Sequence, residues 1–494
     1  MIVEALGILF LPKHILLLIL AVGAGVIVGA VPGLTSTMAI GLLVPLTFAV
    51  TKYAAFILLL GIYSGAMYGG AITAILLNLP GTPTSAVTAL DGYPMSRKGQ
   101  GGLAIGIATL SSTMGGLISC LFLIFLSLPL ANVAIYFGPP EYFALGAFSL
   151  AVVIALSGGT LVKGLVSMAF GVMLATIGLD PIVQFPRFTL GFTELLVGIP
   201  EVPAIIGLFC VSEAIRMSEP MVMRATVQSS TGGLVATVRM LPRLWTTIVK
   251  SSLIGTFVGI LPGIGALMAS YLSYAEAKRV SKQPEQFGKG MPEGVSASEA
   301  ANNAVTGGAM VPMLALGIPG DTNTLMIFGA MIIHGLVPGP SLFNENVSLV
   351  YVIFGAIILA NLLILPFGLG LARYIAKCAL IDRKYLMPTV AVLAITGASI
   401  GYGHVYYFWI SIIFGLLGYL LQKAKFPLLP IAMSLILAPL IERNFRSSLM
   451  MPDAGLMLFL SRPVPLLCLI LSVLVIGFGI QRERRLAAQA GADE

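Results

Sequence analysis

The sequence predicts an all-α polytopic membrane protein made of two inverted structural repeats with broken helices. Of its 494 residues 58% are hydrophobic and only 10% are charged, and the mean hydropathy is +1.01. A soluble domain carries about 25% charged residues. The apolar runs are long enough for helices, and the alternating ten-residue pattern of an outer-membrane barrel is absent. Polar Pro-Gly turns interrupt these runs in both halves.

The apolar runs place the expected helices, which predict about 11–12 spans. Several runs are shorter than the about 20 residues that cross a ~30 Å hydrocarbon core. We interpret these as arms of re-entrant helical hairpins that end inside the membrane. The runs in the first half are 14–31, 34–50, 54–78, 103–137, 142–157, 160–179 and 198–215. Those in the second half are 244–261, 264–275, 300–318, 323–337, 347–372, 386–402, 405–421, 427–441 and 463–480.

Two Pro-Gly turns in the first half recur in the second. Residues 25–34, with Pro32-Gly33, return at an offset of 230 as residues 255–264, with Pro262-Gly263. Residues 69–85, with Pro80-Gly81, return at an offset of 238 to 239 as residues 307–324, with Pro319-Gly320. One isolated Pro-Gly would favour a kink in a continuous helix, because both residues are common in membrane spans. Four copies in two matching pairs favour true breaks, the pattern of a secondary transporter.

The repeat boundaries follow from this match. Residues 1–216 form the first membrane repeat, 217–243 a cytoplasmic linker rich in Ser, Thr and Gly, and 244–494 the second repeat plus an extra C-terminal span. Corresponding loops differ in positive charge: 96–100 is basic where 341–346 is not, and 276–290 is basic where its partner is short. This asymmetry indicates inverted topology. Arg443, Arg446 and Arg462 do not fit that charge distribution.

The turns carry the residue types that bind a small anion inside a membrane. Helix N-termini offer unpaired N–H groups and a partial positive charge, and small residues let the backbone approach a ligand. The alternative is that the hydroxyl and amide side chains only cap broken helix ends. The predicted substrate-binding residues are Asn78, Pro80, Gly81, Thr82, Thr84, Ser85, Gly320, Thr322, Asn323, Thr324, Thr35 and Ser36, with Thr37 beside them.

Asp321 is the strongest candidate for a coupling ion. A carboxylate inside a membrane is expensive, so it is a functional hypothesis by default. With Asn302 and Asn303 it could coordinate Na⁺ through hard oxygen ligands; carrying a proton, or capping the following helix, are the alternatives. Glu299 begins the same polar stretch and could serve either purpose. The Gly25-xxx-Gly29 and Gly255-xxx-Gly259 pairs predict helix-packing surfaces.

Other classes of function have little support. The net charge of +7 follows from Lys and Arg in short loops, so it does not indicate nucleic acid as a partner. The four cysteines share no metal-like spacing, the three histidines are far apart, and no Walker-type phosphate loop is present. We therefore expect no enzyme and no bound cofactor, with energy from an ion gradient. Asp91-Gly92 aligns with His334-Gly335, which predicts that both cap equivalent turns.

The chain resembles the large membrane subunit of the tripartite tricarboxylate transporters. The matching stretches are 25–34, 68–94, 255–265 and 292–304 leading into 316–320. The resemblance implies Na⁺-coupled uptake of citrate-like di- or tricarboxylates across a bacterial inner membrane. It also implies a small membrane subunit and a periplasmic solute-binding protein as partners, in addition to the lipid bilayer and the organic carboxylate. A passive organic-anion channel and a membrane-embedded enzyme are the competing hypotheses.

Overall fold

The chain forms two compact units in the structure, which is a computed structural model. It describes residues 2–156, 160–218, 234–378, 383–400, 403–451, 455 and 457–490. Unit 1 comprises residues 1–131, 217–260 and 265–390, and unit 2 comprises 132–216, 261–264 and 391–494. Each unit therefore draws on both halves of the sequence. The proposed repeat boundaries and the inverted relation between the repeats stay predictions.

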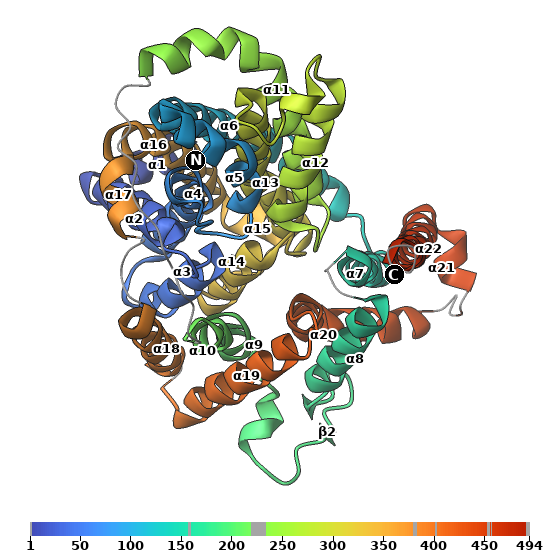
Figure 1. Ribbon diagram of the computed structural model, residues 1–494. Helices are drawn as coiled ribbons and strands as arrows, with labels where there is room; N and C mark the ends of the chain where they lie inside the picture. The colour runs from blue at the N-terminus through green and yellow to red at the C-terminus, as the bar shows by residue number, and fades with distance from the viewer. Residues whose placement is uncertain are drawn as a thin grey trace. The chain divides into compact units, whose positions relative to one another are not determined.

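Unit 1 contains all four helix pairs that the Pro-Gly turns separate (Figure 1). Its elements are α1 (Ile2–Leu9), α2 (Pro12–Ala30), α3 (Ser36–Leu43), η1 (Pro45–Ala49), α4 (Lys52–Leu77), α5 (Ser85–Met95), η2 (Ser96–Gln100), α6 (Gly101–Ala134), α11 (Leu234–Ile260), α12 (Gly265–Val280), η5 (Pro284–Gln286), α13 (Pro292–Leu316), α14 (Thr322–Ile333), α15 (Pro340–Glu345), α16 (Val347–Pro366), η6 (Phe367–Leu371), α17 (Ala372–Cys378) and α18 (Arg383–Ile400). The last turn of α6 and the second half of α18, from residue 391, belong to unit 2.

Unit 2 contains the remaining helices and one small hairpin. Its elements are α7 (Pro139–Leu156), α8 (Leu161–Ala175), β1 (Gly178–Leu179), β2 (Pro186–Arg187), η3 (Glu194–Val197), α9 (Glu201–Ile206), η4 (Gly207–Val211), α10 (Ser212–Met217), α19 (Val405–Lys423), α20 (Leu429–Leu449), α21 (Met457–Ser461) and α22 (Pro463–Ala490). The strands β1 and β2 pair antiparallel.

The all-α membrane fold is confirmed. Within the described ranges, seven helical segments are long and apolar enough to cross a membrane. As helices, these segments satisfy their backbone hydrogen bonds internally, which the hydrocarbon core of a membrane requires. The segments are Pro12–Ala30, Lys52–Leu77, Ser85–Ala134, Pro139–Leu156, Val347–Cys378, Val405–Lys423 and Pro463–Arg484.

The four Pro-Gly turns are true breaks in the helices. The chain leaves helical geometry at residues 31–35, 78–84, 261–264 and 317–321. Equivalent positions share a backbone conformation: Gly33 and Gly263 have φ of 98° and 85°, and Asn78 and Gly317 have φ of 54° and 72°. The left-handed residue after α4 or α13 ends the helix, and Asn is the non-glycine residue that adopts this conformation most readily. The sequence repeat is therefore also a repeat of local structure.

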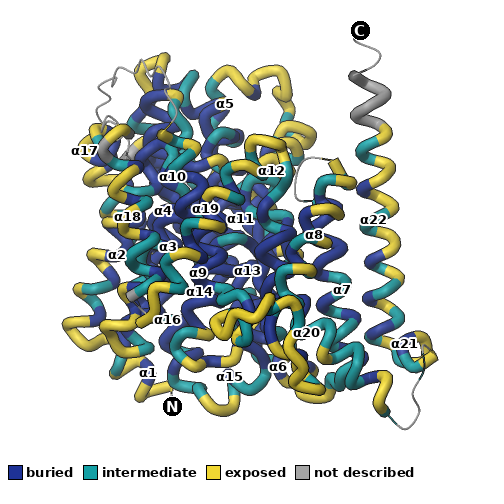
Figure 2. The backbone as a smooth tube through the Cα atoms, turned by 90° about the horizontal axis from the view of Figure 1, so that it is seen from below, coloured by how far each residue is buried: buried dark blue, intermediate teal, exposed yellow. Residues whose placement is uncertain are grey.

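Glycines allow the helices of each half to pack at backbone contact. A Cβ on Gly29 of α2 would meet the carbonyl of Ala66 on α4, and a Cβ on Gly255 of α11 would meet that of Ala301 on α13. The predicted packing role of both Gly-xxx-Gly pairs is thus confirmed. Figure 2 shows α4 and α13 as mostly buried helices, and both lie in unit 1.

Several element boundaries differ from the apolar runs. Helix α11 begins ten residues before the run at 244, so the end of the predicted linker is helical, while residues 219–233 of that linker lie outside the described residues. Helix α13 begins at Pro292, before the run at 300. The predicted loop 96–100 is a π-helical turn in which only Gly99 has non-helical angles (φ 77°). Hydropathy marks the apolar part of a helix, whereas polar residues continue its hydrogen bonds beyond it.

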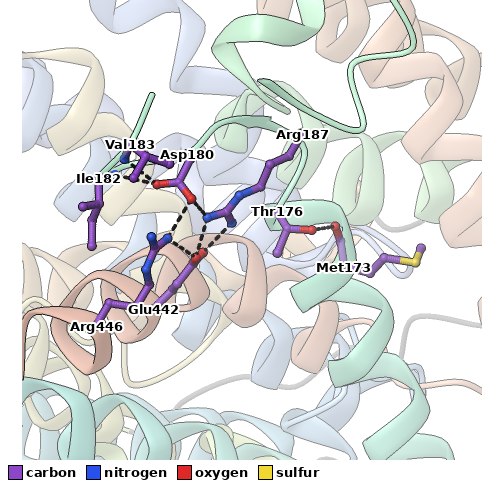
Figure 3. Close-up of polar contacts among 8 residues, drawn as sticks. All are labelled: Met173, Thr176, Asp180, Ile182, Val183, Arg187, Glu442 and Arg446. Atoms are coloured by element: carbon purple, nitrogen blue, oxygen red, sulfur yellow. Dashed lines mark hydrogen bonds and ion pairs between the residues drawn. The ribbon is translucent and has the colours of Figure 1, made fainter. Parts of the chain in front are cut away.

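Two arginines that did not fit the predicted charge distribution, Arg446 and Arg462, form ion pairs with acidic residues in unit 2. Figure 3 shows Arg446 and Arg187 both directed at Asp180 and Glu442. Arg446 Nη1 lies 2.7 Å from Asp180 Oδ2, and Arg187 Nη2 lies 2.8 Å from Glu442 Oε1. The network fixes the β1–β2 hairpin to α20. Arg462 likewise lies 3.1 Å from Glu141. Arg446 and Arg462 are therefore each paired with an acidic residue of unit 2.

Candidate functional site

The second turn of the second half meets the start of α3 from the first half. Asn323 Oδ1 accepts hydrogen bonds from Ser36 Oγ at 2.8 Å and from Thr37 Oγ1 at 2.9 Å. The hydroxyls of Thr37 and Thr322 are also 2.9 Å apart. These three contacts join residues almost 290 positions apart in the chain, for example Ser36 and Asn323 at a separation of 287. The structure therefore brings together predicted residues from two different Pro-Gly turns.

Asp321 is the N-cap of α14 and is buried, with 4% of its surface exposed. Its Oδ1 accepts from the backbone N–H of Thr324 at 2.8 Å and from the Thr324 hydroxyl at 2.7 Å, which completes a capping box. Its Oδ2 accepts from Asn323 Nδ2 at 2.9 Å. The capping role that the sequence left open is thus present. A role for Asp321 as a Na⁺ ligand stays a prediction.

Two residues of α4, Tyr63 and Met67, belong to this site although the sequence did not single them out. The Tyr63 hydroxyl donates to Asp321 Oδ2 at 3.3 Å. The Met67 sulfur accepts weak hydrogen bonds from Ser36 Oγ and Asn323 Nδ2 at 3.7 and 3.8 Å. The repeat offset of 239 residues maps Tyr63 onto Asn302, a polar position in both halves. That match is the signal that could have identified Tyr63.

The equivalent turn of the first half is closed on itself. The Ser85 hydroxyl donates to the carbonyl of Thr82 at 2.8 Å, and the hydroxyls of Thr82 and Thr84 are 3.0 Å apart. Thr82 and Ser85 are buried, and Gly81 lies against the carbonyl of Gly29. The hydrogen bonds described for these hydroxyls lie within the turn, whereas those of the second-half turn reach α3 and α4.

The remaining predicted residues either cap a helix end, as Asn78 and Thr35 do, or shape a turn, as Pro80 and Gly320 do. Asn78 is exposed and ends α4, and its backbone N–H bonds to the carbonyl of Thr73. Thr35 is the N-cap of α3 and accepts from Met38 N at 3.2 Å. Pro80 and Gly320 shape the two turns, and Gly320 packs on the carbonyl of Gly259 just as Gly81 packs on that of Gly29. These residues position the turns.

Asn302 and Asn303 lie deep inside unit 1 on α13, each with none of its surface exposed. Asn302 Nδ2 donates to the backbone carbonyl of Met67 at 2.8 Å, which ties α13 to α4 beside the site. Among the described residues, Asn302 Oδ1 and both polar atoms of Asn303 have no hydrogen-bond partner. Buried amides are rarely left unpaired, because the loss of water is then not compensated. Unpaired, hard carbonyl oxygens are suitable ligands for an alkali cation.

Asp91 has a different position from the one that the sequence predicted. It lies inside α5, and its Oδ1 accepts from the backbone N–H groups of Gly288, Gly290 and Met291. It therefore caps the segment that enters α13, and the prediction that Asp91-Gly92 and His334-Gly335 cap equivalent turns is wrong. His334 does end a helix, α14. Helix α5 continues through the position where the second half has a turn.

The arrangement can bind an anion without a lysine or arginine. The N-terminus of α14 supplies backbone N–H groups and partial positive charge, and the hydroxyls of Ser36, Thr37 and Thr322 supply neutral donors. These hydroxyls now bond to Asn323 or to one another, so a bound carboxylate would replace those partners. The buried Asp321 carboxylate lies next to these donors, with its Oδ2 2.9 Å from Asn323 Nδ2.

Comparison with known proteins agrees with this architecture. The sequence model of the Tripartite tricarboxylate transporter TctA family matches residues 15–433. An "Uncharacterized 52.8 kDa protein in TAR-I ttuC' 3'region" of Agrobacterium vitis is 36% identical over 453 residues, which cover 92% of this chain and 90% of that protein. An "Uncharacterized protein in TAR-II ttuC' 3'region" of the same organism is 31% identical over 227 residues, covering 44% of this chain and 94% of that protein. No solved structure matches the chain significantly. The apolar spans, the paired helix breaks and the match over most of the chain together show that this protein belongs to the tripartite tricarboxylate transporter TctA family and is a multi-pass membrane subunit of a transporter.

Proposed function

We propose that this protein is the large membrane subunit of a secondary active transporter that takes up citrate-like di- or tricarboxylates with Na⁺. The observation that carries the proposal is the joined site of Ser36, Thr37 and Asn323 at the start of α14. It collects hydroxyl and N–H donors at two interrupted helices, where a carboxylate group is recognised by hydrogen bonds. A cluster of neutral donors suits an anion that must be released again on the other side.

Coupling to Na⁺ is supported by the acidic and amide oxygens next to the donors. Asp321 supplies a buried negative charge, and Asn302 and Asn303 supply buried oxygens that lack partners among the described residues. These groups fit a hard monovalent cation. When Na⁺ binds beside the substrate, it offsets part of the charge that the carboxylate brings into the low-dielectric interior. A proton on Asp321 is the alternative form of the same coupling.

The family membership supports the proposed setting. A tripartite system requires a small membrane subunit and a solute-binding protein, which we propose to be periplasmic and to deliver the substrate. The membrane is then the inner membrane of a bacterium. Selection among carboxylates is shared with the binding protein, because this chain receives substrate that its partner has already bound.

The test is uptake of labelled di- and tricarboxylates into proteoliposomes that contain this chain, the small subunit and the binding protein encoded beside the gene. Accumulation that requires both an inward Na⁺ gradient and the binding protein supports the proposal. Uptake driven equally by a H⁺ gradient without Na⁺ refutes Na⁺ coupling, and equilibration without accumulation identifies a passive channel. Asp321→Ala is expected to abolish Na⁺-dependent accumulation.

The site itself is tested by Asn323→Ala. Hydrogen bonds to a charged ligand contribute about 1.5–3 kcal/mol each, so uptake at low substrate concentration should fall roughly 10- to 100-fold. Asn444→Ala is the matched control, because Asn444 is half-buried in unit 2 and its side-chain amide donates to the carbonyl of Leu440 in its own helix at 2.8 Å. Equal uptake by both variants would exclude the Asn323 site.

A further inference from the structure

Glu299 is a buried carboxylate that the proposed substrate site does not use. It lies on α13 with none of its surface exposed. Its Oε1 accepts a hydrogen bond of 2.5 Å from Thr88 Oγ1 on α5, and its Oε2 accepts one of 2.8 Å from Ser112 Oγ on α6. Three helices from both halves of the sequence thus meet at this carboxylate.

The groups that face Glu299 are neutral. Among the described residues, its partners are the Thr88 and Ser112 hydroxyls and the Asn302 amide, and no lysine, arginine or histidine pairs with it. Tyr68 of α4 also lies near, with its hydroxyl 2.8 Å from that of Thr109. Asp91, on α5 with Thr88, is held by Tyr274 and backbone N–H groups. An ionised carboxylate without a cation is strongly unfavourable inside a protein, so the site as built lacks one positive charge.

Further side-chain oxygens lie beside the hydroxyls that bond the carboxylate. Ser298 Oγ lies 3.0 Å from Thr88 Oγ1, and it can direct its proton to the carbonyl of Gly294 at 3.1 Å. Each hydroxyl has two lone pairs, so one that donates elsewhere still offers an acceptor. Asn302, one helical turn along α13, has a fully buried Oδ1 with no partner in the described part of the chain. This unpaired buried oxygen is a second observation, independent of the carboxylate, that favours a bound cation here.

We propose that Glu299, Thr88, Ser112, Ser298 and Asn302 Oδ1 form a Na⁺ site. One carboxylate oxygen supplies the charge, and the hydroxyl and amide oxygens supply the hard ligands that a small cation requires. The inference rests on the proposed Na⁺-coupled function and assigns Asn302 Oδ1 to a Na⁺ centre at Glu299, in addition to the Asp321 carboxylate beside the substrate site. Both oxygens of Asp321 and both oxygens of Glu299 accept hydrogen bonds, but the side chain of Asn302, whose Oδ1 has no partner among the described residues, lies at Glu299.

The position of this site explains how the cation acts on transport. Thr88 lies one helical turn after Ser85 of the first-half turn, while Asn302 bonds the carbonyl of Met67, whose sulfur contacts Ser36 and Asn323. A cation that joins α5, α6 and α13 therefore holds the supports of both turns. By linkage, whatever Na⁺ adds to substrate affinity, the substrate adds to Na⁺ affinity.

The experiment measures Na⁺ binding without transport. The full chain is purified, and its thermal unfolding midpoint is followed as NaCl replaces choline chloride at constant ionic strength and pH. The wild-type midpoint should rise and saturate with Na⁺. Glu299→Gln should remove the Na⁺ response while raising the midpoint in Na⁺-free buffer, because the unpaired charge is gone. Ser112→Ala should keep the response with roughly tenfold weaker apparent affinity.

Glu276→Gln is the control, because Glu276 lies at the exposed end of α12 beside Arg279 and should respond to Na⁺ as the wild type does. A Na⁺ response retained in Glu299→Gln overturns the site. So does a wild-type midpoint that rises with protons and not with Na⁺, which would make Glu299 a proton carrier. Uptake data separate the two proposals. If Na⁺ binds through Glu299 but no carboxylate is taken up, only the proposed substrate class is refuted. If Na⁺-driven uptake is unchanged in Glu299→Gln, only the Glu299 Na⁺ site is refuted.

Discussion

Replacing Asp91 should destabilise unit 1 by an amount that its hydrogen bonds set. The Asp91 side chain is fully buried, with three backbone N–H groups at 2.7–2.9 Å on Oδ1 and the Tyr274 hydroxyl at 2.8 Å on Oδ2. Asp91→Ala leaves these donors without an acceptor. Each unsatisfied buried group costs about 1–3 kcal/mol, and Gly288 can regain water at the surface, so we expect a loss of roughly 2–5 kcal/mol.

Asp91→Asn separates the charge from the geometry. The amide oxygen can still accept from the backbone, and the Tyr274 hydroxyl can turn to accept from the amide. Since charge-assisted hydrogen bonds are about twice as strong as neutral ones, this variant should lose about 1–2 kcal/mol. The assay is denaturant or thermal unfolding of the purified chain, with the exposed Glu285→Ala as control. If Asp91→Ala lies within about 0.5 kcal/mol of that control, the capping argument is refuted.

Three further substitutions test other contacts. Gly320→Ala should destabilise the fold by about 1–3 kcal/mol, because the new Cβ would lie 2.6 Å from the Gly259 carbonyl oxygen. Gly7→Ala is the control, since its Cβ would meet nothing within 4 Å. Unfolding midpoints that fall equally in the two variants would contradict this. Tyr63→Phe should reduce carboxylate uptake only a few-fold, because its bond to Asp321 is long, and a complete loss of uptake would show a larger role. Arg446→Met should speed proteolysis of the segment 177–198 relative to Arg443→Met, since Arg446 bonds Asp180 and Glu442 while Arg443 is exposed; equal cleavage rates would argue against the anchoring network.

The sequence anticipated which residues lie in the turns of the site, but not which of these residues contact one another. The sequence placed Ser36 and Asn323 in candidate turns, but it did not indicate which of the four turns meet. The described contacts join the later turn of the second half to the first turn of the first half. Turn chemistry is local, whereas the choice of which turn meets which follows from how α3, α4 and α14 pack.

The sequence by itself determined the membrane class, the family resemblance, the positions of the four helix breaks and the glycine surfaces. These features depend on neighbouring residues: apolar runs must satisfy backbone groups as helices, proline lacks an N–H, and glycine permits positive φ and close approach. Only the tertiary structure decided that Tyr63 and Met67 join the site, that Asp91 caps the entry to α13, and that Glu299 meets Thr88 and Ser112. Those partners lie far apart in the chain, so helix packing, which no local pattern encodes, brings them within hydrogen-bond distance.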